Sequence, residues 1–418
     1  MARLHRCLAL GLALLAAGCM PPDERAIRFA TWGSVDEVAL LKPLIAEFER
    51  THPETPVELV HVPDGYFQKL PVMVASGQMP DVVFLNNWNL PAYASSDALA
   101  DLGPLLAKDA DLAASDFFAQ ALDAMRYRGK LHAIPRDLSN LVVYVNTDRL
   151  AEAGHSLPKP SWTLDEMRRL ARSLTRDTDA DGALDTFGIS FDKRPLFWMP
   201  YVWSAGGDMF SADLSRSTLA SPEAIAALQA YADTQRAPHA APNETQTGNA
   251  PMAQLFAQGK LAMFVSGRWS VPGFRKNLTF GWDVLPFPRG KAGSVVDVDA
   301  SGWAIARESR HPQAAWELVK FLASRRASET FAGGGLIVPA RRDVAESPRF
   351  LDAAQAPKGA RAFVDAIETG RPMRTPPNWN EVSNELDQQL EPLWAGREAA
   401  APVLKRAAAR IDELLGQP

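Results

Sequence analysis

Aromatic and short polar side chains stand together directly after two apolar runs near the start of the chain. Trp32 follows the run that ends at Thr31, and Asn86 and Trp88 follow the run that ends at Leu85. An indole ring offers a large apolar face at low conformational cost, whereas an amide both donates and accepts hydrogen bonds. Such a set suits a molecule that has apolar C–H faces and a rim of hydroxyl groups. Each of these side chains is also compatible with core packing or with a loop turn.

The sequence lacks the motifs of several common classes of enzyme. It contains no G-x-S-x-G nucleophile elbow, no H-E-x-x-H, no Walker loop and no dinucleotide-binding fingerprint. Its two cysteines are Cys7 and Cys19, so the rest of the chain has no thiol nucleophile, no cysteine zinc site and no disulfide. His132 lies in an apolar run, which is more typical of a structural histidine.

An acidic run between residues 177 and 185 is the one candidate metal site. Aspartates alternate along it and a glycine follows, which resembles the first half of an EF-hand calcium loop. The Glu expected at the twelfth position is absent, because Gly188 occupies that place. The run therefore predicts either a calcium loop or a metal-free polar turn. The candidate ligands are Asp177, Asp179, Asp181 and Asp185.

The hydrophobic pattern that must position these residues is that of an α/β protein. Strands are predicted at 26–31, 57–62 and 81–85, with helices at 38–48 and 66–76 between them. This order implies a mostly parallel sheet with helices on both faces, and ligands of such sheets lie beyond the carboxyl ends of the strands. A second α/β pattern covers 141–265. Further helices are predicted at 312–323 and 380–415.

Length and composition favour two folded lobes. The chain has 418 residues, of which 47% are hydrophobic and 22% charged, so it is long enough for two cores. The formal net charge of −5 and the absence of a basic stripe argue against a nucleic-acid partner. Beyond the N-terminus, no apolar stretch approaches the roughly 20 residues that span a bilayer.

The N-terminus resembles a lipoprotein export signal. Arg3 and Arg6 precede an apolar run, and small residues precede Cys19. We predict a signal peptide over 1–19 that ends at a lipidated Cys19, followed by a tether over 20–25. Ala16 occupies the place where a lipobox usually has Leu, so an ordinary signal peptide is the alternative. Both predict an extracytoplasmic protein, in the first case lipid-anchored to the membrane.

Eight short segments in register along the chain are together far more specific than any one of them. They are Gln78–Val83, Tyr127–Pro135, Tyr144–Asn146, Trp162–Glu166, Ala262–Phe264, Gly267–Trp269, Leu285–Pro288 and Ala315–Glu317. In this order the segments resemble family 1 extracellular solute-binding proteins, the maltose-binding-protein-like group of sugar importers, and the resemblance covers nearly the whole mature chain.

The resemblance implies a type II periplasmic-binding-protein fold. Each lobe is expected to hold a mostly parallel sheet flanked by helices, and the chain crosses between the lobes more than once. The implied N-terminal lobe combines 26–136 with 286–325, and the C-terminal lobe combines 137–285 with 326–418. A ligand would lie between the lobes, which close on it like a hinged trap. The loaded monomer would then dock on the transmembrane subunits of an ABC permease.

The resemblance also implies which aromatic side chains meet the ligand. Trp269 corresponds to a Trp that stacks on the sugar in similar proteins. Of Trp198 and Trp203 we expect one in the cleft and one in the core. Trp303 follows Gly302, which allows close backbone approach. The indole candidates are Trp32, Trp88, Trp198, Trp203, Trp269 and Trp303.

Polar candidates lie around the first implied crossing. A polar residue near Ser139 bonds sugar hydroxyls in similar proteins. Asp137 is a second candidate, although Arg136 and Asp137 are also adjacent and oppositely charged, so they are equally expected to pair with each other. Arg268 either reaches a ligand oxygen or faces solvent. Asn86 is either a ligand contact or a turn residue.

Three functions follow from these observations, in descending order of support. The first is capture of a carbohydrate or polyol for an ABC importer, without catalysis and without a cofactor other than the calcium considered above. The second is binding of a non-sugar solute such as a glycerol phosphoester, which favours Arg136 or Arg268 inside the cleft. The third is a secreted glycan-processing enzyme that uses Asp137 and Asp299, whose carboxylates would need to lie about 5–10 Å apart.

Overall fold

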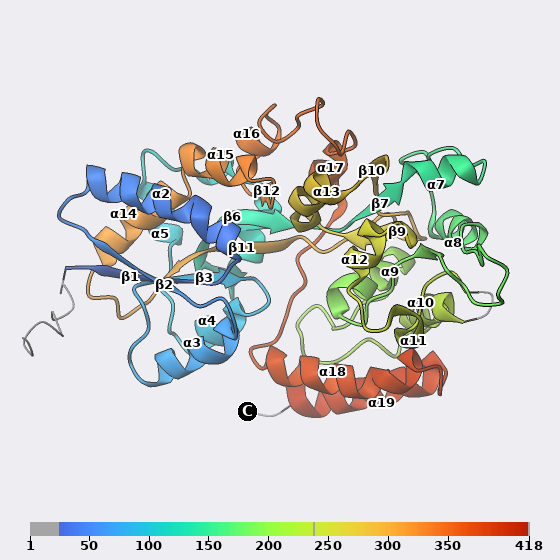
Figure 1. The fold of residues 1–418 in the computed structure, drawn as a ribbon. Coiled ribbons are helices and arrows are strands. Elements are labelled where there is room, and N and C mark those ends of the chain that lie inside the picture. Colours follow the sequence, from blue (N-terminus) through green and yellow to red (C-terminus); the bar gives the residue numbers. More distant parts are fainter. Residues whose placement is uncertain (1–24, 237–238, 417–418) are drawn as a thin grey trace, which may run out of the picture.

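Two α/β lobes lie side by side in the computed structural model, which describes residues 25–236 and 239–416 (Figure 1). Strands β6 and β11 approach the centre from one lobe, and β7, β9 and β10 approach it from the other. The predicted signal peptide, Cys19 and most of the tether lie outside the described residues. Within those residues, no helix combines the length and the apolar character needed to cross a membrane.

A six-stranded sheet forms the N-terminal lobe, in the order β12-β6-β11-β3-β1-β2. Its central strands are short apolar runs that are almost wholly buried. The strands are β1 (Ile27–Thr31), β2 (Val57–His61), β3 (Val82–Asn86), β6 (Ala133–Ser139), β11 (Asp299–Ile305) and β12 (Val338–Pro339). A separate hairpin is formed by β4 (Arg126–Tyr127) and β5 (Lys130–Leu131).

Amphipathic helices cover this sheet. Helix α2 begins after Ser34, whose side chain accepts a hydrogen bond from the Glu37 N–H, and it buries a face that includes Leu41 and Phe48. Helices α14 and α15 both pack against α2. The helices of this lobe are α2 (Val35–Thr51), α3 (Tyr66–Ala75), α4 (Leu90–Ser95), α5 (Gly103–Lys108), η1 (Ala114–Asp116), α6 (Ala119–Ala124), α14 (Pro312–Leu322), α15 (Arg325–Gly333) and α16 (Arg342–Ala345).

A four-stranded sheet, in the order β10-β7-β9-β8, forms the C-terminal lobe. The strands are β7 (Val142–Asn146), β8 (Phe187–Ile189), β9 (Leu261–Ser266) and β10 (Trp282–Pro286). The helices are α7 (Thr147–Glu152), α8 (Leu164–Ser173), α9 (Pro195–Ala205), α10 (Pro222–Ala232), η2 (Asp233–Gln235), α11 (Glu244–Thr247), α12 (Met252–Ala257), η3 (Arg268–Ser270), α13 (Val271–Asn277), α17 (Arg361–Thr369), α18 (Trp379–Trp394) and α19 (Ala400–Leu415).

The sheets are mixed, whereas the sequence predicted mostly parallel ones. The pairs β1–β2, β1–β3 and β8–β9 are parallel. Strand β11 runs antiparallel to both β3 and β6, and β7 runs antiparallel to both β9 and β10. A strand by which the chain enters a lobe begins at the side that faces the other lobe. It is therefore antiparallel to those strands whose carboxyl ends lie at that same side. Crossing strands therefore replace some of the helical connections that parallel sheets require.

The lobe boundaries also differ from the predicted ones. Strand β6 continues through Ser139 within the first sheet, so the chain crosses after 139 rather than after 136. Strand β12 pairs with β6, and α15 packs against both β12 and α2. Residues 326–345 therefore lie with the N-terminal lobe, not with the C-terminal one. A two-residue strand held by a long-range pairing leaves no local pattern in the sequence.

Candidate ligand-binding site

The carboxyl ends of strands from both lobes meet where the chain crosses between them. Ser139 ends β6 and lies opposite Asp299, while Asn86 ends β3 and lies opposite Ser301 in the same strand β11. Three residues after Ser139, Val142 begins β7 opposite the last residue of β9. Because ligands of α/β sheets bind beyond the carboxyl ends of the strands, this junction is the candidate site.

Trp32 borders the junction on the N-terminal lobe. It follows β1 and is half-buried, with its ring 4.3 Å from that of Phe84 and 4.9 Å from that of Phe67, measured between centroids. Two residues after Gly33, Val35 in the first turn of α2 is 81% exposed. Packing holds Trp32 in place while part of its surface remains open.

A buried ion-pair cluster lies at the end of β6. The Arg136 guanidinium pairs with Asp137 and, at 2.6 Å, with Glu37 of α2, and it lies over the Phe84 ring at 4.2 Å. Burial raises the pKa of the Asp137 carboxyl to about 6, although Arg136 opposes this shift. The alternative of an Arg136–Asp137 pair is the one found. Asp137 thus stabilises the strand that leads to the crossing. Of the two predicted polar contacts, half-buried Ser139 is more accessible to a ligand than buried Asp137.

Two further carboxylates lie on the neighbouring strand and its approach. Asp297 accepts hydrogen bonds from the Trp88 indole N–H at 3.0 Å and from the Met373 N–H at 2.9 Å. Burial raises the pKa of Asp297, and burial together with the Asp297 and Asp137 charges raises that of Asp299. Asp299 Oδ1 has no hydrogen-bond partner in the described part of the chain.

Trp88 joins the two lobes rather than standing free. Its indole N–H is taken by Asp297, and its ring meets the edge of Trp379 from α18 at 5.7 Å. The Thr375 hydroxyl donates to the Trp88 carbonyl oxygen. Asn86 Oδ1 accepts hydrogen bonds from the Asn89 backbone and side-chain nitrogens, which is the turn role weighed from the sequence.

Trp269 presents the most accessible indole among the predicted ones. It lies in η3 just after β9 and is 38% exposed. The Gly267 backbone lies against the Trp269 ring, so any side chain at 267 would collide with the indole. The ring borders a hollow of about 500 Å³ that also includes Asp192, Arg194 and Phe197. An aromatic face and short polar groups therefore stand together at the carboxyl ends of β8 and β9.

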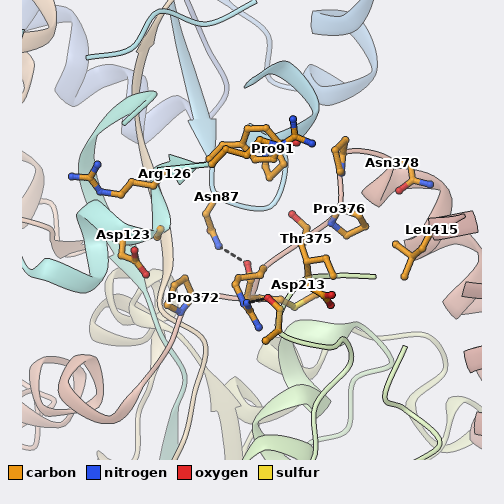
Figure 2. Close-up of a pocket in the computed structure, with 18 of the residues that line it drawn as sticks. Asn87, Pro91, Asp123, Arg126, Asp213, Pro372, Thr375, Pro376, Asn378 and Leu415 are labelled. Atoms are coloured by element: carbon orange, nitrogen blue, oxygen red, sulfur yellow. Dashed lines mark hydrogen bonds between the residues drawn. The ribbon is translucent and has the colours of Figure 1, made fainter. Parts of the chain in front are cut away.

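A larger cavity of about 950 Å³ lies between the lobes and is lined from both sides (Figure 2). Asn87, Asp123 and Arg126 come from the N-terminal lobe, and Asp213 comes from the C-terminal lobe. The extended segment 372–378 forms one wall, where the Met373 carbonyl accepts a hydrogen bond from Asn87 Nδ2 at 3.1 Å. Sequence reasoning missed this wall. Its three prolines mark an extended stretch but indicate no binding role.

Several predicted contacts are instead core residues, and the expectations for them are corrected. Trp198 is fully buried and donates to the Lys193 carbonyl oxygen. Trp203 is 4% exposed, bonded to Asp208, so the expectation that one of this pair faces the cleft is wrong in this conformation. Trp303 is fully buried, with its ring edge-on to Phe29.

Gly302 and Arg268 are also placed differently from the expectation. The close approach that Gly302 permits is to the Ile134 carbonyl of β6, beside an irregularity in the β6–β11 pairing, and not to a ligand. Arg268 is 2% exposed, so it does not face solvent. Its Nε donates to the Gly335 carbonyl oxygen at 3.2 Å.

Residues 32–329 match the family model for bacterial extracellular solute-binding proteins. This chain belongs to that family. The match covers most of the sequence and confirms the resemblance inferred from the eight segments. The description of the family places its members outside the cytoplasm. It also gives the two lobes, the strand ends and the crossings between the lobes a common role, which is to bind a solute.

Relatives of this solute-binding protein include named sugar binders. The diacetylchitobiose-binding protein DasA of Streptomyces coelicolor is 27% identical over 340 residues, which cover 77% of this chain and 73% of that protein. A galactooligosaccharide-binding protein of Bacillus subtilis is 23% identical over 420 residues, which cover 96% of this chain and 94% of that protein. An uncharacterised lipoprotein of Streptomyces antibioticus is 26% identical over 361 residues, covering 81% and 76%.

Solved structures confirm the predicted type II fold. An ABC substrate-binding protein from Listeria monocytogenes, in complex with cycloalternan, superposes with a TM-score of 0.84 at 25% identity, over 94% of this chain and 99% of that one. The GacH receptor of Streptomyces glaucescens superposes with a TM-score of 0.80 at 23% identity, over 93% and 98%.

In the acidic loop of this solute-binding protein, aspartate carboxylates accept hydrogen bonds from backbone N–H groups of the same loop. Carboxylate oxygens of Asp177, Asp179 and Asp185 lie within 4.8 Å of one another, while Asp181 is not part of that cluster. Asp177 accepts hydrogen bonds from the Ala180 and Gly182 backbone N–H groups, and Asp185 accepts from Thr178. These bonds define a tight turn, and a calcium ion there stays a prediction.

Proposed function

We propose that this solute-binding protein captures a carbohydrate or polyol between its lobes and delivers it to the transmembrane subunits of an ABC importer. The observation that carries the proposal is the exposed Trp269 face, which borders a hollow of the C-terminal lobe together with Asp192 and Arg194. Indole rings match the C–H faces of sugars, and the neighbouring polar groups match their hydroxyls. The names of the diacetylchitobiose- and galactooligosaccharide-binding relatives support the same ligand class.

Each lobe would contribute half of the binding surface. We assign Trp269 to the C-terminal half, and Trp32 and Ser139 to the N-terminal half. A ligand that touches both halves stabilises the closed form by its difference in affinity for the two forms. Asp137 and Trp88 act on this surface by positioning the strands and loops that carry it.

No bond is expected to break in the bound solute. The rival use of Asp137 as one of two catalytic acids is disfavoured by its place in an ion pair with Arg136. A retaining or inverting pair needs two carboxyls that face one sugar linkage. If incubation with any tightly bound saccharide released shorter sugars, this part of the proposal would be wrong.

A lipid anchor at Cys19 completes the proposal. It would hold a monomeric binding protein close to its permease at the membrane surface. Labelling cells with a radioactive fatty acid should mark the protein, and Cys19→Ser should abolish the label and release the protein into the soluble fraction. Unlabelled wild-type protein would point instead to an ordinary cleaved signal.

A ligand panel tests the central claim directly. The mature protein with Cys19→Ser is mixed with diacetylchitobiose, galactooligosaccharides, maltotriose, monosaccharides and glycerol phosphoesters. Tryptophan fluorescence and melting temperature are then recorded. We expect at least one saccharide or polyol to shift both. A response to the phosphoesters alone would assign the solute to the other class, and no response at all would count against capture of small solutes of these kinds.

A further inference from the structure

A small cavity separate from the Trp269 hollow lies where η3 and α13 meet the loop between α16 and α17. Its volume is about 150 Å³. Arg268 and Arg275 line it from η3 and α13, and Arg349 lines it from the loop. Asp352 is the one carboxylate in the lining. Guanidinium groups thus outnumber carboxylates around this space by three to one.

Arg268 is the unusual member of this set. It is 2% exposed, and its Nη1 has no hydrogen-bond partner among residues 25–236 and 239–416. Its Nε donates to the Gly335 carbonyl oxygen, and its guanidinium lies 4.5 Å from the Phe350 ring centre and 5.4 Å from that of Phe363. Contacts with aromatic faces and one carbonyl leave a buried positive charge without an anion.

Neighbouring charges accentuate this imbalance. Burial and the charge of Arg275 together lower the pKa of Arg268 to about 10, so it still carries its charge at neutral pH. The Arg275 Nε donates a hydrogen bond to the Ala356 carbonyl oxygen. Arg349 is exposed and its guanidinium lies against the backbone of Gly333. Asp352, the one carboxylate of the lining, attracts Arg275, so three cations converge on a single negative charge.

We propose that this cavity binds a small tetrahedral or planar oxyanion between Arg268, Arg275 and Arg349. Guanidinium groups match phosphate and carboxylate oxygens through paired N–H donors. The volume is about five times the ~30 Å³ that one water molecule occupies in the liquid, which is room for such an anion. The same chemistry has two sources: a free phosphate or sulfate ion, or an anionic group on the captured solute.

The bound oxyanion would lie across the lobe junction. Arg268 belongs to the C-terminal lobe, whereas Gly335 follows α15, which packs on α2 of the N-terminal lobe. An ion held by Arg268 and by the α16–α17 loop would strengthen the contact between these parts. This inference does not depend on the capture of a neutral sugar, because the site is probed with anions and its lining lies apart from the Trp269 hollow.

Melting temperature and isothermal titration with sodium phosphate test the site, with sodium chloride at equal ionic strength as the reference. We expect phosphate to raise the melting temperature of the wild-type protein by several degrees at millimolar concentration. Arg349→Gln, an exposed substitution that the fold should tolerate, should remove most of this shift. Arg310→Gln, at an exposed arginine outside the cavity lining, should retain it.

Arg268→Met adds an independent test. Without an anion, removing an uncompensated buried charge should leave the protein equally stable or more stable in chloride. With an anion, the variant should in addition lose the stabilisation by phosphate. A phosphate shift of equal size in wild type, Arg349→Gln and Arg310→Gln would overturn the proposal.

Glucose 6-phosphate, glucuronate and glucose distinguish the two sources. Binding of inorganic phosphate that survives saturation with a neutral sugar assigns the site to a free ion. Binding of glucose 6-phosphate or glucuronate that Arg349→Gln weakens at least tenfold, without any binding of inorganic phosphate, assigns it to the solute. If neither inorganic phosphate nor an anionic sugar binds, the proposal is wrong, while neutral sugar capture would remain intact.

Discussion

At the scale of single residues, Trp269 is the sharpest test of the proposed sugar site. Trp269 is 38% exposed and its ring packs against the backbone of Gly267, so Trp269→Ala should fold normally. Loss of a stacking face is expected to weaken saccharide binding by about 2 kcal/mol, or about thirtyfold. Titration calorimetry with the saccharide found in the ligand panel measures this change. Trp269→Phe should recover part of the affinity, and an unchanged affinity of Trp269→Ala would exclude stacking at this position.

The carboxylates of β11 and its approach predict how stability depends on pH. An unfolded Asp releases its proton near pH 3.8, whereas the pKa of both Asp297 and Asp299 is raised in the fold. At these two carboxyl groups the folded protein therefore binds more protons than the unfolded chain above about pH 4, and their contribution to the free energy of unfolding should fall as pH rises towards neutrality.

Asp299→Asn isolates this effect. Asp299 Oδ1 has no partner among the described residues and faces the negative charges of Asp297 and Asp137. We expect the variant to be about 1 kcal/mol or more stable than wild type at pH 7.5 and nearly equal to it at pH 4. Urea unfolding at both pH values measures the difference. Asp64→Asn, at an exposed position, is the control, and equal stability of Asp299→Asn at every pH would contradict the argument.

Residue types alone did not separate cleft from core. Trp269 and Trp303 each follow a glycine closely in the sequence, yet one is 38% exposed and the other fully buried. The difference arises from tertiary contacts, because Trp303 lies within a strand against Phe29. Trp269 stands in a turn after its strand. A glycine beside an indole therefore predicts a close backbone approach without saying whether its partner is protein or ligand.

At the scale of elements, the contact between α8 and β8 rests on one glycine. A Cβ at Gly188 would collide with the backbone carbonyl of Ala171. Gly188→Ala should therefore destabilise the C-terminal lobe by about 1–3 kcal/mol, because strand and helix must move apart. Thermal unfolding measures the loss.

Gly273 in α13 provides the matched control for this prediction. Apart from its chain neighbours and its own helix backbone, no heavy atom of the described residues lies within 4 Å of a Cβ placed there, and alanine is a better helix former than glycine. Gly273→Ala should leave the melting temperature unchanged or raise it slightly. Similar losses in both variants would show that close packing at Gly188 is not the cause.

Elements with strong local patterns were predicted well from the sequence, and those defined by distant partners were not. The predicted strand at 57–62 and helix at 66–76 correspond closely to β2 and α3. Strand β6 was not recognised in full, because Pro135, Arg136 and Asp137 interrupt its apolar pattern. Arg136 forms ion pairs with both Asp137 and Glu37, and only the folded structure brings Glu37 close enough to do so.

At the scale of the whole molecule, three kinds of connection hold the lobes together. The crossings from β6 to β7, from β10 to β11 and from α16 to α17 form the covalent hinge. The segment 371–378 adds hydrogen bonds from Asn87 to Met373 and from Thr375 to Trp88. The Trp88 and Trp379 rings add an aromatic contact between the lobes. Lobes that are joined mainly through chain crossings can rotate relative to each other.

Closure of these lobes should be visible as a contraction on saccharide binding. A compact body of this length has a radius of gyration of about 21 Å, and an open two-lobed form should exceed that value until the ligand is added. Small-angle X-ray scattering of the mature protein with and without the saccharide measures the change. At the same saccharide concentration Trp269→Ala should remain in the larger form, because it lacks the contact that favours closure. Saturated binding without any contraction would mean that the lobes do not close on the solute, and the trap mechanism would fail even though binding itself had been shown.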